Sequence, residues 1–280
     1  MPVLIGIGFR PDRELPSSQL TPDRVHALFF SVLGKNLAEE LHRPSRIKPF
    51  SLWFLPFFRE ERNLDRVFIE VSFLKEDLFP RFLSSFMMEE GDLRLGETTL
   101  KRIKRPRIDE SMVVSYRRIY EEAPEDPTIV MDFITPTTFK KGESDYPLPD
   151  PKLVFKSLIR KWSAFSDLRI DTDLREVVES RIQVSGAWIR TRKVCLSKLG
   201  KVVGFTGRVV FFVDSEERNV LKWINALARF GEFAGVGRKT TMGFGKVRLV
   251  KSVPREDFEV CGEDPEEGRV AEDIGQGGVQ

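Results

Sequence analysis

The sequence predicts an α+β protein made of two successive β-α-β-β-α-β halves. Strand-like apolar runs occur at residues 3–9 and 202–213, and apolar residues recur at helical spacing at 151–165 and 216–230. A proline- and acid-rich segment, EEAPEDP at 121–127, separates the halves. The element order on both sides of it is that of the ferredoxin-like fold, which RNA-recognition modules share. We therefore expect two tandem ferredoxin-like domains, each with an antiparallel sheet under two helices.

In the first half, short strands are expected to alternate with two helical regions. The expected strands cover residues 3–9, 50–58, 67–74, 98–103 and 112–119, and the expected helices cover 22–41 and 76–88. Thr21 is the expected N-cap of the first helix, because Pro22 suits the first helical position. We expect Gly34 to end this helix in the left-handed conformation. Asn36, with Glu39 three residues later, then resembles the capping box of a short second helix.

The second half repeats this order and is followed by a tail of different composition. The expected strands cover 129–133, 177–189, 202–213 and 245–251, and the expected helices cover 151–165 and 216–230. These elements predict an N-terminal domain at 1–120 and a C-terminal domain at 128–253. The tail at 254–280 is rich in glycine and acidic residues with few large apolar ones, so we expect it to be disordered.

The basic charge of the chain is concentrated before this tail. Residues 254–280 contain nine acidic and two basic residues, which leaves 43 Lys or Arg and 34 Asp or Glu in residues 1–253, a net charge of +9. Such a body favours a polyanionic partner, and a mixed solvated surface is the alternative.

Three features of the sequence bear on where the protein works. No run of 18 apolar residues is present, so no membrane span is expected. The N-terminus lacks the basic lead and the cleavage site of a signal peptide. Cys195 and Cys261 have neither metal-ligand nor disulfide spacing, which fits a reducing cytoplasm.

The most informative segment is residues 230–248, FGEFAGVGRKTTMGFGKVR, hereafter the glycine loop. Four glycines surround two cations and two hydroxyls, namely Gly235, Gly237, Gly243, Gly245, Arg238, Lys239, Thr240 and Thr241. Glycines let backbone N–H groups approach a ligand, and consecutive N–H groups can form an anion-binding nest, so the loop predicts phosphate binding. It leaves a helix and enters a strand, unlike a Walker loop or a dinucleotide fingerprint. An ordinary glycine cap and turn is the alternative.

The glycine loop, as GVGRKTTMGFGKVRL, resembles the C-terminal loop of the repeat-associated (RAMP) proteins of CRISPR systems. More narrowly, the chain resembles the sixth Cas family, the endoribonucleases that cut precursor CRISPR RNA within its repeats. The segments that carry this likeness, besides the loop, are RVHALFFSVLG at 24–34, ELHRPSRIKPFSLWF at 40–54, DFITPTTFK at 132–140 and VVGFTGRVVFFV at 202–213. The resemblance covers residues 1–252 and leaves out the acidic tail.

This resemblance implies a metal-independent ribonuclease that needs no cofactor. The 2′-hydroxyl attacks the neighbouring phosphate and leaves a 5′-hydroxyl and a 2′,3′-cyclic phosphate. Such chemistry needs a base, an acid and a cation for the phosphate charge. The chain has two histidines, His26 and His42, and histidine exchanges protons near neutral pH. Neither has a cysteine pair or a carboxylate at ligand spacing, so we expect no metal site.

His42 and Lys48 are the catalytic candidates that the resemblance implies. In the family a histidine at the His42 place is the usual acid or base, and a lysine at the Lys48 place stabilises charge on the phosphate. Arg43 and Arg46, in the cationic segment RPSRIK, are expected to contact neighbouring phosphates. From the sequence alone, an exposed histidine at a helix C-terminus remains the alternative for His42.

His26 is the third catalytic candidate. In one unbroken helix it would lie about 24 Å from His42, so the break near Gly34 is needed to bring the two together. The chain departs from a common family pattern, because it has Phe29 and Phe30 near the place of a tyrosine. His26 is expected to substitute for that tyrosine, or else only to pack or contact RNA.

Arg190 and Lys193 complete the predicted RNA contacts. They punctuate a long strand with other cations and are expected either to line a groove between the halves or to face water. The implied partner is CRISPR repeat RNA. Two other functions remain open: a non-cleaving subunit that binds guide RNA among the subunits of a CRISPR effector complex, and a general RNA-binding adaptor. Formation of a homodimer is also left open.

Overall fold

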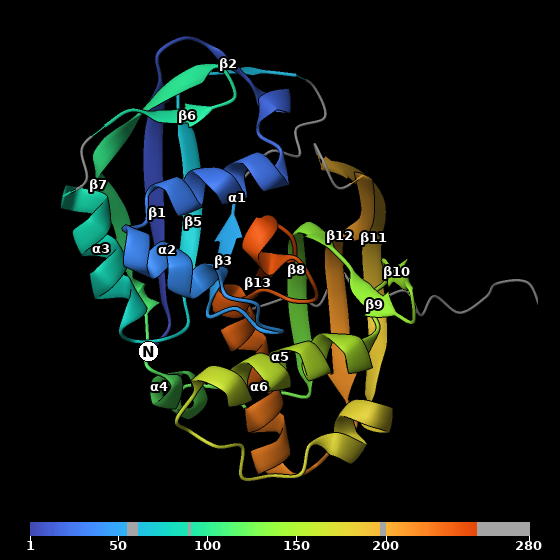
Figure 1. Ribbon diagram of the computed structural model, residues 1–280. Helices are drawn as coiled ribbons and strands as arrows, with labels where there is room; N and C mark the ends of the chain where they lie inside the picture. Colours follow the sequence, from blue (N-terminus) through green and yellow to red (C-terminus); the bar gives the residue numbers. More distant parts are fainter. Residues whose placement is uncertain (55–60, 89–90, 197–199, 251–280) are drawn as a thin grey trace, which may run out of the picture. The chain divides into compact units, whose positions relative to one another are not determined.

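Two antiparallel sheets, one in each half of the chain, organise the computed structural model, which describes residues 1–54, 61–88, 91–196 and 200–250 (Figure 1). The first sheet has the strand order β3-β5-β1-β7-β6. Its strands are β1 (Val3–Pro11), β3 (Phe50–Trp53), β5 (Val67–Phe73), β6 (Leu93–Leu95) and β7 (Thr98–Val113). Its helices are α1 (Pro22–Ser31), α2 (Lys35–His42) and α3 (Leu78–Met88).

The second sheet has the order β11-β12-β8-β13. Its elements are β8 (Thr128–Thr137), β11 (Ile182–Leu196), β12 (Gly200–Val213), β13 (Val247–Leu249), α5 (Pro151–Phe165) and α6 (Arg218–Ala234). In both sheets the main strands, counted along the chain, lie in the spatial order fourth, first, third, second. This is the arrangement that β-α-β-β-α-β connectivity gives in a ferredoxin-like fold. The predicted fold class is confirmed.

The smaller elements lie between and beside these. They are β2 (Leu15–Pro16) paired with β4 (Asn63–Leu64), the hairpin of β9 (Phe139–Lys141) and β10 (Ser144–Tyr146), the helix α4 (Tyr116–Glu121), the 3₁₀ turns η1 (Ser17–Gln19) and η3 (Thr240–Met242), and the π-helical turn η2 (Val177–Arg181).

Each sheet has its own hydrophobic core on the face that its helices cover. In the first half, Ile5 and Ile69 of the sheet share a core with Phe29 of α1 and Phe82 of α3. In the second half, α5 and α6 pack on β8 and β12 around Trp162 and other large side chains. Residues 1–250 nevertheless form one compact unit. The domain boundaries at 120, 128 and 253 stay a prediction, and the predicted disorder of 254–280 falls outside the described residues.

Contacts between the two halves are made where α6 ends. Ser51 of β3 donates a hydrogen bond from its hydroxyl to the carbonyl of Phe233, at 2.6 Å, and both residues are buried. A buried hydroxyl needs such a partner, and this bond fixes the end of α6 against the first sheet. The glycine loop, which begins in the last turn of α6, is therefore held beside the first half of the chain.

The expected break between the first two helices is present, but its local details were wrong. Val32 ends α1, and Gly34 has a φ of −59° as the N-cap of α2, so it is not left-handed. Asn36 lies inside α2, and the N-cap makes no side-chain hydrogen bond, so there is no capping box. A shift of two residues in the helix start is enough to move a cap signal into the helix.

Two expected strands were also wrong in extent. Residues 112–119 do not form a separate strand, because β7 runs unbroken to Val113 and α4 follows. Ser115 starts that helix by accepting a hydrogen bond from the backbone N–H of Arg118 at 3.1 Å, an N-cap signal that the apolar pattern obscured. Residues 177–181, expected to begin a strand, form η2 ahead of β11. Residues 55–60, within the strand expected at 50–58, lie outside the described residues.

Candidate active site

His26 joins the first helix to the glycine loop. Its Nδ1 lies 2.7 Å from the backbone carbonyl of Thr241, a residue 215 positions away. A carbonyl only accepts hydrogen bonds, so Nδ1 carries the proton in this contact. The neutral imidazole then presents an unprotonated Nε2, the form that can accept a proton from a substrate.

The surroundings of His26 favour its neutral form. Burial lowers the pKa of His26 below the usual 6.5, and the nearby His42 and Lys48 lower it further. The hydrogen bond to the Thr241 carbonyl acts in the opposite direction. Because burial is the largest contribution, the imidazole stays neutral at neutral pH and keeps its Nε2 lone pair.

The fold brings His42 close to His26, with Phe30 between them. The ring of Phe30 is centred 4.7 Å from the ring of His26 and 5.5 Å from that of His42. His42 is exposed at the end of α2, in an open hollow that Arg43 and Pro44 also line. The convergence expected from the helix break is therefore present. Phe30 carries no exchangeable proton, so it can only pack between the two imidazoles.

Lys48 holds the turn that follows His42. Its ammonium donates to the carbonyl of Leu41 at 2.8 Å and to the carbonyl of Arg43. These carbonyls belong to the last turn of α2, where a cation also complements the helix dipole. Partial burial lowers the pKa of Lys48. One of its three N–H donors remains for a phosphate, and Arg43 and Arg46 are exposed beside it.

The glycines of the loop are needed for close approach to the protein's own backbone. At Gly237, with a φ of +80°, a Cβ atom would lie 2.4 Å from the carbonyl oxygen of Thr138. At Gly245, with a φ of +74°, it would lie 2.0 Å from the carbonyl oxygen of Val236. Gly235 and Gly243 also have positive φ. An L-residue is therefore excluded both by its conformation and by contact.

The predicted anion-binding nest is wrong for much of the loop. The N–H groups of Val236, Arg238 and Gly245 donate to the carbonyls of Gly245, Thr138 and Pro136, and that of Gly237 donates to the hydroxyl of Ser157. These amides are occupied within the fold and cannot bind an anion. The loop is built chiefly to present side chains and the Thr241 carbonyl.

The polar side chains of the loop are unequally available. Arg238 forms an ion pair with Asp145 of β10, which offsets its charge. Thr240 is buried, and Thr241 is partly exposed. Lys239 is partly buried with a left-handed backbone, and burial lowers its pKa, followed by the neighbouring Arg238. Of the two cations, Lys239 is the better placed to meet a phosphate, because Arg238 already has a counterion.

Arg190 and Lys193 are exposed on β11, but they do not share a face. The register of β11 with β12 is unbroken from Gly186 to Leu196, and side chains alternate between faces along a strand. Arg190 therefore lies on one face of the sheet and Lys193 on the other. The two side chains cannot line the same groove, so at most one of them can belong to the predicted RNA groove.

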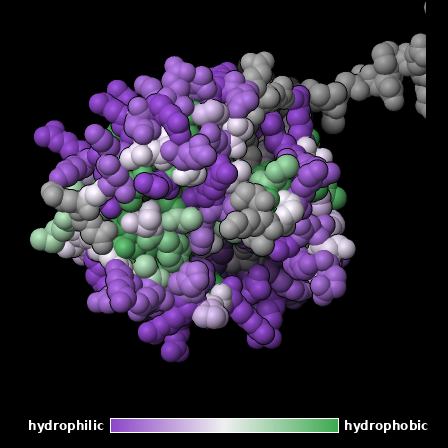
Figure 2. All heavy atoms as spheres, turned by 45° about the horizontal axis from the view of Figure 1, so that its top comes forward, coloured by the Kyte–Doolittle hydropathy of each residue, from purple (hydrophilic) through white to green (hydrophobic). Residues whose placement is uncertain are grey.

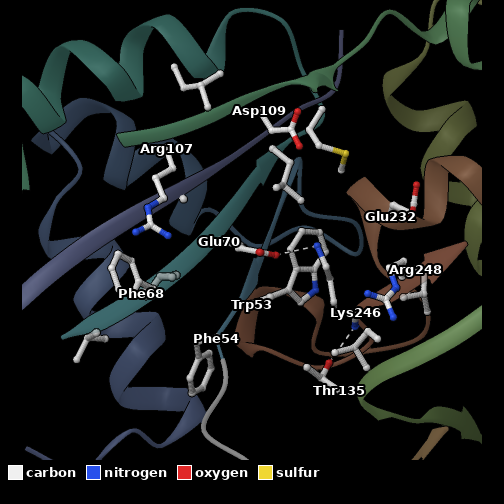
Figure 3. A pocket seen from close by; sticks show the side chains of 18 of the residues that line it. Trp53, Phe54, Phe68, Glu70, Arg107, Asp109, Thr135, Glu232, Lys246 and Arg248 are labelled. Carbon is white, nitrogen blue, oxygen red and sulfur yellow. Dashed lines mark hydrogen bonds and ion pairs between the residues drawn. The ribbon is translucent and has the colours of Figure 1, made fainter. Parts of the chain in front are cut away.

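A cleft of about 730 Å³ lies between the two halves, but neither Arg190 nor Lys193, expected at such a groove, is among the residues that line it (Figure 3). Phe68 of β5 is 40% exposed there, with the guanidinium of Arg107 4.6 Å from its ring centre. On the opposite side the ammonium of Lys246 lies 3.9 Å from the ring centre of Trp53 and 2.8 Å from Glu70. Cations over aromatic rings beside an exposed phenyl ring suit the stacking of nucleobases.

The glycine loop lines part of the cleft with Lys246 and Arg248, and it also meets Phe54. This residue lines the cleft, and a Cβ atom at Gly243 would lie 2.5 Å from its ring. Hydrophilic side chains cover most of the face seen in Figure 2, which is hollowed near its middle.

Two polar residues of α5 that support the loop were also missed. Ser157 and Lys161 are buried, although they lie in a helix whose buried face is otherwise apolar. The available signal was a lysine three residues after Leu158 and seven after Val154, on the apolar face of the helix.

The described part of the chain has neither a cluster of metal-binding side chains nor a membrane-spanning helix. Within residues 1–54, 61–88, 91–196 and 200–250, no group of three or more His, Cys, Asp or Glu side chains is placed to hold a metal ion. Among the helices of those same ranges, none is long and apolar enough to cross a membrane.

Known sequences similar to this chain are CRISPR-associated. The family model described as CRISPR-associated endoribonuclease Cas6 matches residues 131–247. The protein of that description from Mycobacterium tuberculosis is 32% identical over 150 residues, which are 53% of this chain and 47% of the relative. A Cas6 from Streptococcus thermophilus is 26% identical over 119 residues, 42% of this chain and 48% of the relative. The chain thus spans about half the length of the curated relatives it matches.

The similarity to solved structures extends over both halves. A Cas6 product complex matches with a TM-score of 0.76 and 27% identity, covering 89% of this chain and 100% of that chain. A Thermus thermophilus Cas6 matches with a TM-score of 0.70 and 26% identity, covering 89% and 98%. Because 89% of the chain is more than either half contains, each match extends into both halves.

Proposed function

We propose that the chain is a member of the Cas6 family of CRISPR-associated endoribonucleases and that it cleaves precursor CRISPR RNA within its repeats without a metal ion. The observation that carries the proposal is the 2.7 Å contact between His26 Nδ1 and the Thr241 carbonyl. This contact connects His26, a residue suited to proton transfer, with the glycine loop, which the sequence predicts to bind RNA. His26, His42 and Thr241 come from one chain, so the proposed site needs no second copy.

In the proposed reaction each histidine handles one proton. The 2′-oxygen of the nucleotide before the cut attacks the phosphorus, and its proton passes to Nε2 of His26. The bond from phosphorus to the 5′-oxygen breaks, and His42 gives a proton to that oxygen. The products are a 2′,3′-cyclic phosphate and a 5′-hydroxyl. Lys48 offers its remaining N–H donor to the phosphate oxygens while their charge grows.

The rest of the RNA is proposed to bind beside this centre. Lys239, Arg43 and Arg46 supply charge for the backbone, and the cleft with Phe68 supplies a ring for stacking. The partner is repeat RNA, and the two cysteines without disulfide spacing support a cytoplasmic site of action.

Single-turnover cleavage of labelled cognate repeat RNA in EDTA tests the proposal. We expect cleavage in EDTA, and no cleavage of an otherwise identical RNA with a 2′-deoxy nucleotide at the cut. His42→Ala should reduce the rate by roughly 10²- to 10⁴-fold, while filter binding changes only a few-fold, because proton transfer contributes to the transition state and not to ground-state binding.

His26→Asn separates the two roles of His26. An asparagine amide can still donate to the Thr241 carbonyl, but it offers no base in the place of Nε2. A rate loss similar to that of His42→Ala, with binding kept, supports His26 as the base. Cleavage by both variants at the wild-type rate would refute the site. Binding without cleavage by the wild-type protein would instead favour a non-cleaving subunit of an effector complex.

A further inference from the structure

A buried ammonium group supports the glycine loop from beneath. Lys161 of α5 is 9% exposed, and its Nζ donates to the carbonyls of Ala234 and Gly235 at 2.8 and 2.9 Å and to the hydroxyl of Thr240 at 3.3 Å. Three donors thus meet three acceptors. The two carbonyls end α6, and the hydroxyl belongs to η3, so one side chain spans the loop from its beginning to its turn.

Ser157 acts on the same loop from one turn earlier in α5. Residues four positions apart lie on one face of a helix, and the Ser157 hydroxyl accepts the N–H of Gly237 at 3.1 Å. Ser157, Lys161 and Thr240 are all buried. Together they form a polar support that leaves the loop little freedom to change shape.

The support leads directly to the candidate active site. Thr240, which Lys161 holds, is followed by Thr241, whose carbonyl accepts the Nδ1 proton of His26. We propose that Lys161 is a positioning residue: it fixes the turn of the glycine loop so that the Thr241 carbonyl selects the Nδ1-protonated tautomer of His26. Its kinetic consequence rests on the proposed function, whereas its effect on the tautomer does not.

Burial lowers the pKa of Lys161 to about 7, so the site penalises the charged form. An apolar side chain of the same length would avoid that cost, but it would leave the carbonyls of Ala234 and Gly235 and the hydroxyl of Thr240 without this donor. The amine is therefore explained by the loop groups that it binds.

The tautomer can be read directly, because the protein has two histidines. Ring-¹⁵N-labelled protein is studied by two-dimensional NMR without RNA, with His42→Gln used to assign the signals. We expect the neutral His26 of the wild-type protein to be protonated at Nδ1. In Lys161→Met we expect a mixture with a large Nε2-protonated share. Arg160→Met, which removes an exposed cation from the next position of α5, should leave the tautomer unchanged.

A second variant keeps the test decisive if Lys161→Met does not fold. Thr240→Val removes the hydroxyl that Lys161 contacts and keeps the shape of the side chain, so it should shift the tautomer in the same direction. An unchanged His26 tautomer in the folded variants overturns the proposal, whatever their thermal stability.

The kinetic measurement adds a readout that depends on the proposed function. With repeat RNA, Lys161→Met should lower kcat by roughly 10-fold or more and change KM less, because the His26 base is misplaced while the phosphate contacts of Arg43, Arg46 and Lys48 remain. A rise in KM alone would contradict a positioning role. If the wild-type protein does not cleave, the proposed function fails, and the NMR result still decides the role of Lys161.

Discussion

Replacing Gly245 by alanine should disrupt the glycine loop, and Gly142→Ala provides its matched control. Both glycines have a left-handed backbone, with φ of +74° at Gly245 and +60° at Gly142. At Gly142, in the turn between β9 and β10, a new Cβ would meet nothing within 4 Å. That variant therefore isolates the conformational cost of a left-handed alanine, about 1 kcal/mol.

At Gly245 the same methyl group has no room. Its carbon would lie 2.0 Å from the carbonyl oxygen of Val236, so the two must separate by about 1.4 Å to reach an ordinary contact of 3.4 Å. A shift of that size breaks the hydrogen bond from Val236 N–H to the Gly245 carbonyl (2.8 Å) and strains the one from Gly245 N–H to Pro136 (3.1 Å). Adding two such bonds to the conformational cost gives a loss of about 2–4 kcal/mol.

Urea unfolding of the two variants measures this difference, and repeat cleavage measures its consequence. We expect Gly245→Ala to lose about 1–3 kcal/mol more than Gly142→Ala and to cleave more slowly, because Thr241 moves with the loop. Gly142→Ala should cleave like the wild-type protein. Equal stability losses in the two variants would refute the argument that the loop requires close backbone approach.

Two further predictions concern charge. Because burial lowers the pKa of His26, the midpoint of the acidic limb of the kcat/KM profile should lie below pH 6.5. Below pH 6.5 the unfolded chain binds a proton at His26 more readily than the folded protein does. His26 should therefore lower the free energy of unfolding as the pH falls from 6.5 toward the folded pKa. A limb above 6.5 would contradict the neutral base. Lys239→Met should weaken RNA binding and reduce the slope of log affinity against log salt by about 0.7–0.9, whereas Arg238→Met should do so less, because Asp145 already pairs with Arg238. Equal slopes for both variants in filter binding would show that the ion pair opens on RNA.

Much of the fold could be predicted because its signals are local. The helix α5 was expected at 151–165 and lies at Pro151–Phe165, since Asp150 caps it and Pro151 suits its first turn. The predicted conformation of Gly34 and the predicted capping box at Asn36 were wrong, because both depend on the residue at which α2 begins. The helix α4 was missed because its short apolar pattern also fits a strand.

The candidate site was predictable as a set of residue types but not as an arrangement. The sequence singled out His26 and His42 because they are its two histidines, and the glycine loop because four glycines there surround two cations and two hydroxyls. It did not indicate that loop amides such as that of Gly237 are occupied within the fold. Lys161 was not recognised, because a lysine on the apolar face of a helix can also extend its charged end to water.

By itself the sequence determined the order of the main helices and strands and the place of the glycine loop, since these follow from periodicity and from the backbone freedom of glycine. Tertiary structure alone decided which groups meet. It placed the Thr241 carbonyl against a histidine 215 residues away, which sets the imidazole's tautomer, and it buried that ring enough to keep it neutral. Hydrogen-bond partners and desolvation depend on neighbours distant in the chain, and no local pattern specifies them.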